Sequence, residues 1–156
     1  MSVQVSASNK NFGFLRYGEA KTKTGTILQD AARATPLVFG TVLAQVAASR
    51  KWVPLTDVTA VATGENTARG IFIGDNVTAA ALVAGDVLNQ QILIGGPCTI
   101  DAQQVVLENN VTLSTVVSDD PAGADNGVVN VRVVEDDLMR IGIFVEDTLD
   151  ITALEN

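Results

Sequence analysis

The sequence predicts a mainly β protein: a small β-barrel or β-clip-like domain with one or two short helices and an extended N-terminal arm. Of its 156 residues, 47% are hydrophobic but only 4% are aromatic, so the core is aliphatic and rich in residues that favour pleated strands. Short apolar runs alternate with Gly- and Pro-containing turns from residue 25 onward. The phrase Leu-Val-x-Gly-x-Val-Leu occurs at 37–43 and again at 82–88, which suggests two similar entries into core strands.

We expect an arm at residues 1–25 and a single domain at residues 26–156, because the length accommodates one sizeable core. The arm is polar, contains three glycines and has no sustained period of a strand or a helix. It nevertheless contains four larger apolar side chains, namely Phe12, Phe14, Leu15 and Tyr17. These either pack on their own domain or anchor on a partner, since a purely solvated tail does not need them.

The first half of the domain contains three expected strands, at residues 26–28, 42–46 and 52–55. Pro36 and Gly40 bracket a turn before the second strand, and the polar residues 49–51 form the turn after it. Pro54 lacks an amide donor, which predicts that its strand lies at a sheet edge.

Beyond a polar loop at 56–66, the remaining expected strands before residue 118 are at 68–73, 87–94, 105–107 and 111–117. Residues 95–97 (Gly-Gly-Pro) predict a turn, and Asn109-Asn110 predict another. Asp101 is in a suitable place to cap one helical turn at 102–104.

The C-terminal part is expected to hold an exposed loop at 119–127 and then a helix. The apolar residues Val131, Val134, Leu138 and Ile141 fall on one helical face, with Asn130 as the cap. A strand at 128–134 is the competing interpretation. A short strand at 141–145 follows.

The two copies of the repeated phrase predict similar local structures. Gly40 and Gly85 are expected to turn the chain with positive φ, and the following Val-Leu pair is expected to enter the core. Internal duplication and independent use of the same turn chemistry both remain open. The phrase is not a phosphate-binding loop, because neither G-x-G-x-x-G nor a following Lys-Ser/Thr is present.

The charge is distributed unevenly along the chain. The net charge is +5 over residues 1–51 and −13 over residues 52–156, which gives −8 in all. An acidic body disfavours nucleic acid as a partner, whereas a basic arm suits an acidic protein surface. Alternatively, the basic residues neutralise the acidic body of the same molecule.

There is no apolar run of membrane-spanning length and no signal-peptide pattern. The lone Cys98 is expected to be a small buried hydrophobe.

The composition argues against catalysis. The chain has no histidine, which removes the commonest general base and metal ligand, so we expect no enzyme activity, no metal and no cofactor. The adjacent acids Asp119-Asp120 and Asp136-Asp137 are expected on the solvated surface. The loop 119–127 does not fit the EF-hand pattern, because no Glu closes a twelve-residue loop.

Several short motifs occur in a characteristic order. They are Lys51-Trp52-Val53-Pro54 after a glycine turn and strand, Ala68-Arg69-Gly70-Ile71-Phe72 before Asp75-Asn76-Val77, a strand ending in Gly96-Pro97, and Met139-Arg140-Ile141-Gly142-Ile143. Over residues 26–145 this order and spacing resemble the head decoration proteins of lambda-type tailed phages. The longer arm and the 109–130 stretch depart from the compact lambda type.

The resemblance implies a non-catalytic structural protein that binds the outer surface of an expanded phage capsid and clamps neighbouring subunits. Its partners are then the major capsid protein and further copies of itself in a homotrimer, and it is made in the host bacterial cytoplasm. The residues expected to bind the capsid are Phe12, Phe14, Leu15, Arg16, Tyr17, Lys21 and Lys23. The alternative is a β-clip module that binds a carbohydrate or small ligand, with Trp52 and Tyr17 as its candidate aromatics. A minor enzyme domain is the third hypothesis.

Overall fold

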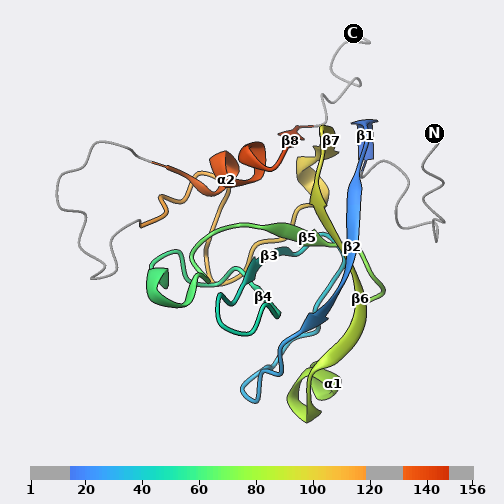
Figure 1. Ribbon diagram of the computed structural model, residues 1–156, viewed down its shortest axis with the longest axis vertical. Helices are drawn as coiled ribbons and strands as arrows, with labels where there is room; N and C mark the ends of the chain where they lie inside the picture. Colours follow the sequence, from blue (N-terminus) through green and yellow to red (C-terminus); the bar gives the residue numbers. More distant parts are fainter. Residues whose placement is uncertain (1–14, 119–131, 148–156) are drawn as a thin grey trace, which may run out of the picture.

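A computed structural model describes residues 15–118 and 132–147, with the side chains of residues 15–17 excepted. The protein is mainly β, as predicted, with a closed five-stranded barrel and a separate three-stranded sheet (Figure 1). The strands are β1 (Leu15–Gly18), β2 (Lys21–Ile27), β3 (Val42–Gln45), β4 (Trp52–Pro54), β5 (Gly70–Phe72), β6 (Val87–Gly95), β7 (Cys98–Asp101) and β8 (Ile143–Glu146). The helices are α1 (Ala79–Ala84) and α2 (Val134–Arg140), with 3-10 turns η1 (Val61–Thr63) and η2 (Ala102–Gln104).

The barrel has the strand order β2-β4-β3-β5-β6 and closes through a long antiparallel ribbon of β2 and β6. In the smaller sheet β7 is central, antiparallel to β1 and parallel to β8. Turns form where the sequence predicted them, at Gly40, at Gly95–Pro97 and at Asn109-Asn110, whose φ angles of 52° and 62° are left-handed. Asp101 caps η2 by accepting a hydrogen bond from the Gln103 amide at 3.0 Å, also as predicted.

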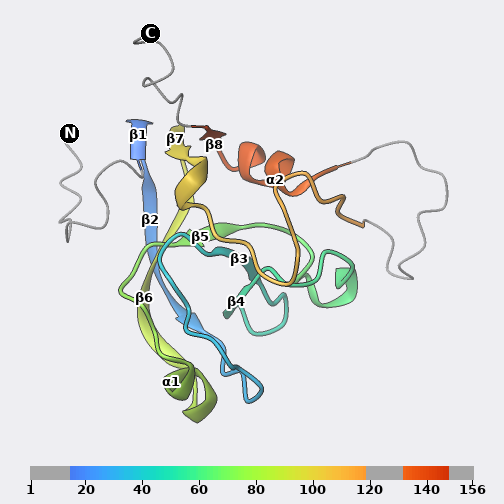
Figure 2. The same ribbon diagram turned by 180° about the vertical axis from the view of Figure 1, so that it is seen from behind.

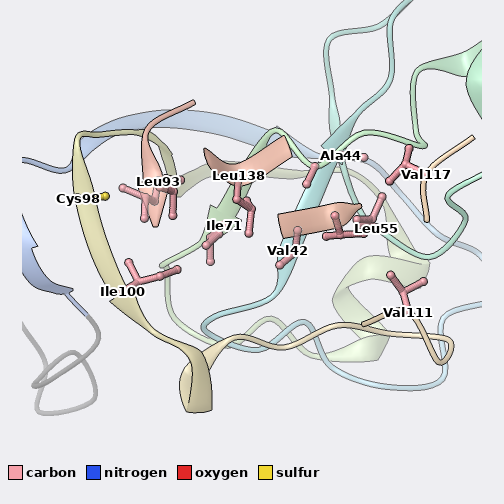
Figure 3. Close-up of a cluster of buried hydrophobic side chains, with 13 residues drawn as sticks. Val42, Ala44, Leu55, Ile71, Leu93, Cys98, Ile100, Val111, Val117 and Leu138 are labelled. Atoms are coloured by element: carbon pink, nitrogen blue, oxygen red, sulfur yellow. The ribbon is translucent and has the colours of Figure 1, made fainter. Parts of the chain in front are cut away.

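Two hydrophobic clusters bury opposite faces of the barrel strands. Each of the five strands contributes one residue to the cluster inside the barrel, namely Ile27, Leu43, Trp52, Phe72 and Ile92. The neighbouring residues on these strands face outward, and they include Val42, Ala44, Ile71 and Leu93 (Figure 3). They pack against residues of the small sheet and α2, namely Cys98, Ile100, Leu138 and Ile143. Because both faces are buried, β3 and β5 have continuous apolar sequences without alternation. Cys98 is buried as expected, and desolvation raises the pKa of its thiol.

The barrel accommodates its single tryptophan by using glycines on two other strands. A Cβ atom on Gly25 of β2 would lie 2.6 Å from Trp52 Nε1 and 2.8 Å from Ile92 Cδ1. On β5, a Cβ atom on Gly70 would lie 3.1 Å from Trp52 Cζ3. The indole therefore fills the interior between β2 and β5, and there glycine supplies space for the ring.

This packing predicts the result of replacing Gly25 with alanine. The added methyl group overlaps the indole, so we expect the free energy of unfolding to fall by about 1–3 kcal/mol through overpacking. Urea denaturation followed by Trp52 fluorescence measures the loss, and the folded-state emission should also shift. An unchanged midpoint and spectrum would contradict this account of the barrel interior.

Two expectations about strands are wrong. Pro54 does not mark an edge strand, because β4 lies between β2 and β3. β4 pairs with β2 only at Ile27–Trp52, so Pro54, which lacks an amide donor, lies outside that ladder. Segments 105–107 and 111–117 form isolated bridges, at Val106 and Val116, and no strand. Their apolar residues cover the outward cluster as extended chain, which gives the same burial signal as a strand.

The expected arm boundary at residue 25 also differs from the structure, since β1 and β2 begin at Leu15 and Lys21. Residues 21–24 have no apolar period because all four are exposed, and β2 is held there by its main-chain ladder to β6. The alternation of apolar and polar residues therefore cannot predict such a strand. Phe12 and Phe14 lie outside the described residues.

The helix near residue 134 forms, and Val134 and Leu138 are buried as predicted. It begins later than expected, with Val133 at the N-cap, whose amide donates to the Asp136 carboxylate at 2.9 Å. Asn130, Val131, the loop 119–127 and Asp119-Asp120 lie outside the described residues.

The expectation of a solvated Asp137 is wrong. Its side chain is 1% exposed and forms an ion pair with Arg132 at 3.0 Å. It is buried because the face of α2 that carries Asp137 packs toward the loop before β5. There the Ala68 amide donates to Asp137 Oδ2 at 3.3 Å.

The two copies of the repeated phrase adopt different structures. Gly40 has a φ of +88° and precedes β3, whose Val42 and Leu43 are buried, as predicted. Gly85 follows α1 with a φ of 169°, an extended value open to any residue, so the expected positive φ is wrong. Leu88, at the start of β6, is 62% exposed and does not enter the core.

Candidate interaction surface

The described candidate residues lie along one side of the molecule. Leu15, Arg16 and Tyr17 belong to β1, which continues through a short turn into β2, where Lys21 and Lys23 are exposed (Figure 1). The structure therefore brings five of the seven expected residues into two consecutive strands. We refer to β1 together with Lys21–Thr24 as the basic strip.

Main-chain pairing leaves one edge of this strip open within the described residues. β1 pairs with β7 through Leu15–Ile100, Tyr17–Thr99 and Gly18–Cys98, and the described part of the chain has no strand on its other side. An edge strand presents amide and carbonyl groups that can pair with an extended segment of another protein.

The basic residues of the N-terminal third divide into two groups. Arg33 forms a two-pronged ion pair with Glu108 at 2.5 Å, with side-chain exposures of 7% and 19%. This contact raises the pKa of Arg33. Lys51 pairs with Asp86 at 2.5 Å, and that hydrogen bond holds the pKa of Asp86 below its ordinary value. These cations neutralise the acidic body of the same molecule, as one of the two sequence hypotheses expected.

Lys21 and Lys23 behave differently. Both are exposed, and within the described residues neither forms an ion pair. Their partners across the ladder on β6 are Gly95 for Lys21 and Ile92 for Lys23, and neither carries a charge. The basic strip thus keeps its positive charge available on a chain whose net charge is −8.

The described residues contain no group of three His, Cys, Asp or Glu side chains placed to hold a metal ion. They also include no helix that is both long and apolar enough to span a membrane. Trp52, one of the two aromatics that a carbohydrate site would use, is 4% exposed inside the barrel.

Sequence reasoning missed one exposed feature, the side chain of Leu88. The pattern Gly-Asp-Val-Leu matched the first copy of the phrase, so Leu88 was expected in the core. The available signal was Asn89, a residue type that tolerates the left-handed conformation and has a φ of 57° here.

The chain matches no known family model and no curated protein.

Proposed function

We propose that this protein is a head decoration protein that binds the outer surface of an expanded phage capsid and stabilises it by joining neighbouring capsid subunits. The observation that carries the proposal is the basic strip: an edge strand followed by two lysines without partners among the described residues, on an otherwise acidic molecule. Such a surface suits an acidic protein partner that offers an extended segment or a sheet edge.

The positions of the family-like motifs also support this proposal. Lys51–Pro54 comprises β4 with its preceding residue, and Ala68–Phe72 leads into β5. Gly96-Pro97 separates β6 from β7, and Met139–Ile143 joins α2 to β8. Each motif therefore contributes to the framework of the fold, where a shared architecture constrains the sequence. The proposed trimer and the location on the virion surface follow from the same resemblance.

The carbohydrate-binding alternative loses one of its two candidate aromatics. A sugar-stacking platform needs an exposed ring, and the Trp52 ring is enclosed between Gly25 and Gly70. No described feature favours that function over capsid binding.

The test is co-sedimentation with expanded, DNA-free phage heads and, separately, with unexpanded heads. We expect binding to expanded heads only. The double variant Lys21→Glu with Lys23→Glu should bind about tenfold or more weakly, since two exposed ion pairs contribute up to about 1 kcal/mol each. Raised salt should weaken the wild-type protein more than the variant.

The matched control is Arg50→Glu with Arg69→Glu, which changes the net charge equally at exposed residues outside the basic strip. This control should bind heads nearly as well as the wild-type protein. Equal losses in both double variants would show that overall charge acts instead of the strip. Failure of the wild-type protein to bind either form of head would contradict the proposed function.

The folded position of β1 and β2 also determines which truncation is informative. Removing residues 2–24 deletes β1 and half of the ribbon that closes the barrel, so it would unfold the domain. Removing residues 2–14 instead deletes the expected anchors Phe12 and Phe14 and spares every described strand. We expect this shorter truncation to remain folded and to bind heads more weakly.

A further inference from the structure

All three strands of the small sheet begin or end at one place. Gly18 is the last residue of β1, and Cys98 and Ile143 are the first residues of β7 and β8. The ladders put these three residues side by side in one row. The row lies where the β2–β6 ribbon of the barrel meets the small sheet, and Figures 1 and 2 both show the small sheet at that end of the ribbon. We name Gly18, Gly96 and Gly142, the glycines at and beside this row, the glycine junction.

The turn between β6 and β7 is bonded through its main chain to the link between α2 and β8. The Gly96 amide donates to the Ile141 carbonyl at 3.0 Å. The Cys98 amide donates to the Gly142 carbonyl at 2.9 Å. A Cβ atom on Gly96 would overlap the Gly142 carbonyl oxygen, and one on Gly142 would lie 3.3 Å from the Gly96 Cα, so no side chain fits between the two backbones. Gly142 also has a φ of +83°, which favours glycine.

The same turn is bonded on its other side to the end of β1. The Glu19 amide donates to the Pro97 carbonyl at 2.8 Å. Gly18 has a φ of +91°, and a Cβ atom there would overlap that carbonyl oxygen and lie 3.0 Å from the Cys98 Cα. All of these atoms belong to the main chain, so no change of side-chain rotamer relieves the overlap. A larger residue at the junction therefore displaces one segment from another.

The junction divides the basic strip into two parts. β1 ends at Gly18 and belongs to the small sheet, whereas Lys21 and Lys23 belong to the barrel strand β2. Lys21 pairs with Gly95, the residue before Gly96. The orientation of the small sheet against the barrel therefore sets the distance between the β1 edge and the two lysines. The outward hydrophobic cluster also joins the two sheets, but hydrophobic attraction has no direction, whereas main-chain hydrogen bonds do.

We propose that the glycine junction positions the basic strip: it holds the β1 edge and the two lysines in the fixed arrangement that the capsid surface recognises. The binding part of this inference rests on the proposed function. A capsid segment that pairs with β1 reaches Lys21 and Lys23 at the same time only if the two parts of the strip keep their relative position. Fixing that position beforehand lowers the entropy cost of binding. The junction glycines thus act through the strip, as positioning residues.

Hydrogen exchange of the free full chain tests whether the junction fixes the small sheet. Gly142→Val adds a β-branched side chain at a φ of +83° and against Gly96. We expect the amides of β1, β7 and β8 to exchange about tenfold or more faster, while those of β3 and β5 keep their protection. Trp52 fluorescence should stay unchanged, because its ring lies inside the barrel. Gly142→Ala should show the same pattern more weakly, so the test does not depend on the folding of the valine variant.

Co-sedimentation with expanded heads tests the consequence for binding. Gly142→Val should bind about tenfold or more weakly, and its binding should depend less on salt than that of the wild-type protein, because the lysines and the β1 edge no longer act together. Gly142→Ala should again show a smaller change in the same direction.

The matched control is Gly64→Val, at a glycine after η1 and outside the basic strip. Gly64 has a φ of +79°, and a Cβ atom there would lie 3.3 Å from the Gln45 carbonyl oxygen, so the backbone strain and the steric contact resemble those at Gly142. At a temperature at which all variants are folded, this control should keep the protection of the small sheet, the affinity for heads and the salt dependence of the wild-type protein.

Three results would overturn the inference. The first is wild-type protection of the small sheet in both Gly142 variants, and the second is wild-type head binding by them. The third is an equal loss of binding in Gly64→Val, which would show that lost stability is the cause. If the wild-type protein binds neither form of head, the proposed function fails, and hydrogen exchange alone then decides whether the junction fixes the small sheet.

Discussion

Replacing Gly40 with valine should destabilise the protein by about 3–5 kcal/mol, the sum of backbone strain and steric overlap. The φ of Gly40 is +88°, a conformation that a β-branched residue rarely adopts. A Cβ atom there would also overlap the carbonyl oxygen of Gln104. The turn cannot readily move away, because the Gly40 amide donates to Phe72 at 2.8 Å and its carbonyl accepts from Val106 at 2.9 Å. Urea denaturation measures the change.

Gly85→Val is the matched control within the repeated phrase. Gly85 is extended, and a Cβ atom added to it meets no atom within 4 Å. We therefore expect its free energy of unfolding to change by less than about 1 kcal/mol. Similar losses at the two glycines would contradict the structural difference between the two copies.

Asp137→Ala is expected to cost about 3–5 kcal/mol, because it removes the carboxylate that the largely buried guanidinium of Arg132 pairs with. Arg132 has a side-chain exposure of 11% and Asp137 of 1%, and the ion pair measures 3.0 Å. The substitution also removes the acceptor for the Ala68 amide, at the entry to β5. Thermal unfolding should show a large fall in midpoint.

Two further variants separate the ion pair from general effects on α2. Glu135→Gln, in the same first turn, should change stability by less than about 1 kcal/mol. The double variant Arg132→Met with Asp137→Leu should regain a large part of the loss, because no buried charge remains unpaired. If the double variant is no more stable than Asp137→Ala, the ion pair is not the cause of the destabilisation.

Several features were predictable from local sequence because they depend on residues close together in the chain. Asn109-Asn110 adopts left-handed φ angles, since asparagine tolerates them, and Asp101 caps η2 with its own side chain. Val134 and Leu138 share a helical face that becomes buried. The apolar runs that predicted strands form β3, β5 and β6, and each of these strands contributes residues to both clusters. The predicted fold class, mainly β, was therefore correct.

The candidate surface was predictable only in part. Lys21 and Lys23 are exposed, but their strand was not recognised, because four consecutive exposed residues carry no period. Whether a cation is available depends on where acids lie after folding. Arg33 meets Glu108, 75 residues along the chain, whereas the lysines meet no acid among the described residues.

By itself, the sequence determined a β-rich domain with an aliphatic core, the positions of its turns, the excess of negative charge and the absence of histidine chemistry, because all of these depend on composition and near neighbours. Only the tertiary structure decided which of the two matching phrases turns inward. Leu43 enters the barrel after a left-handed glycine, while Leu88 is directed to solvent by a bulge that exists only where β6 pairs with β2. It likewise decided that Asp137 is buried, because only folding brings the Ala68 amide, 69 residues away in the chain, to the Asp137 carboxylate and encloses the ion pair with Arg132.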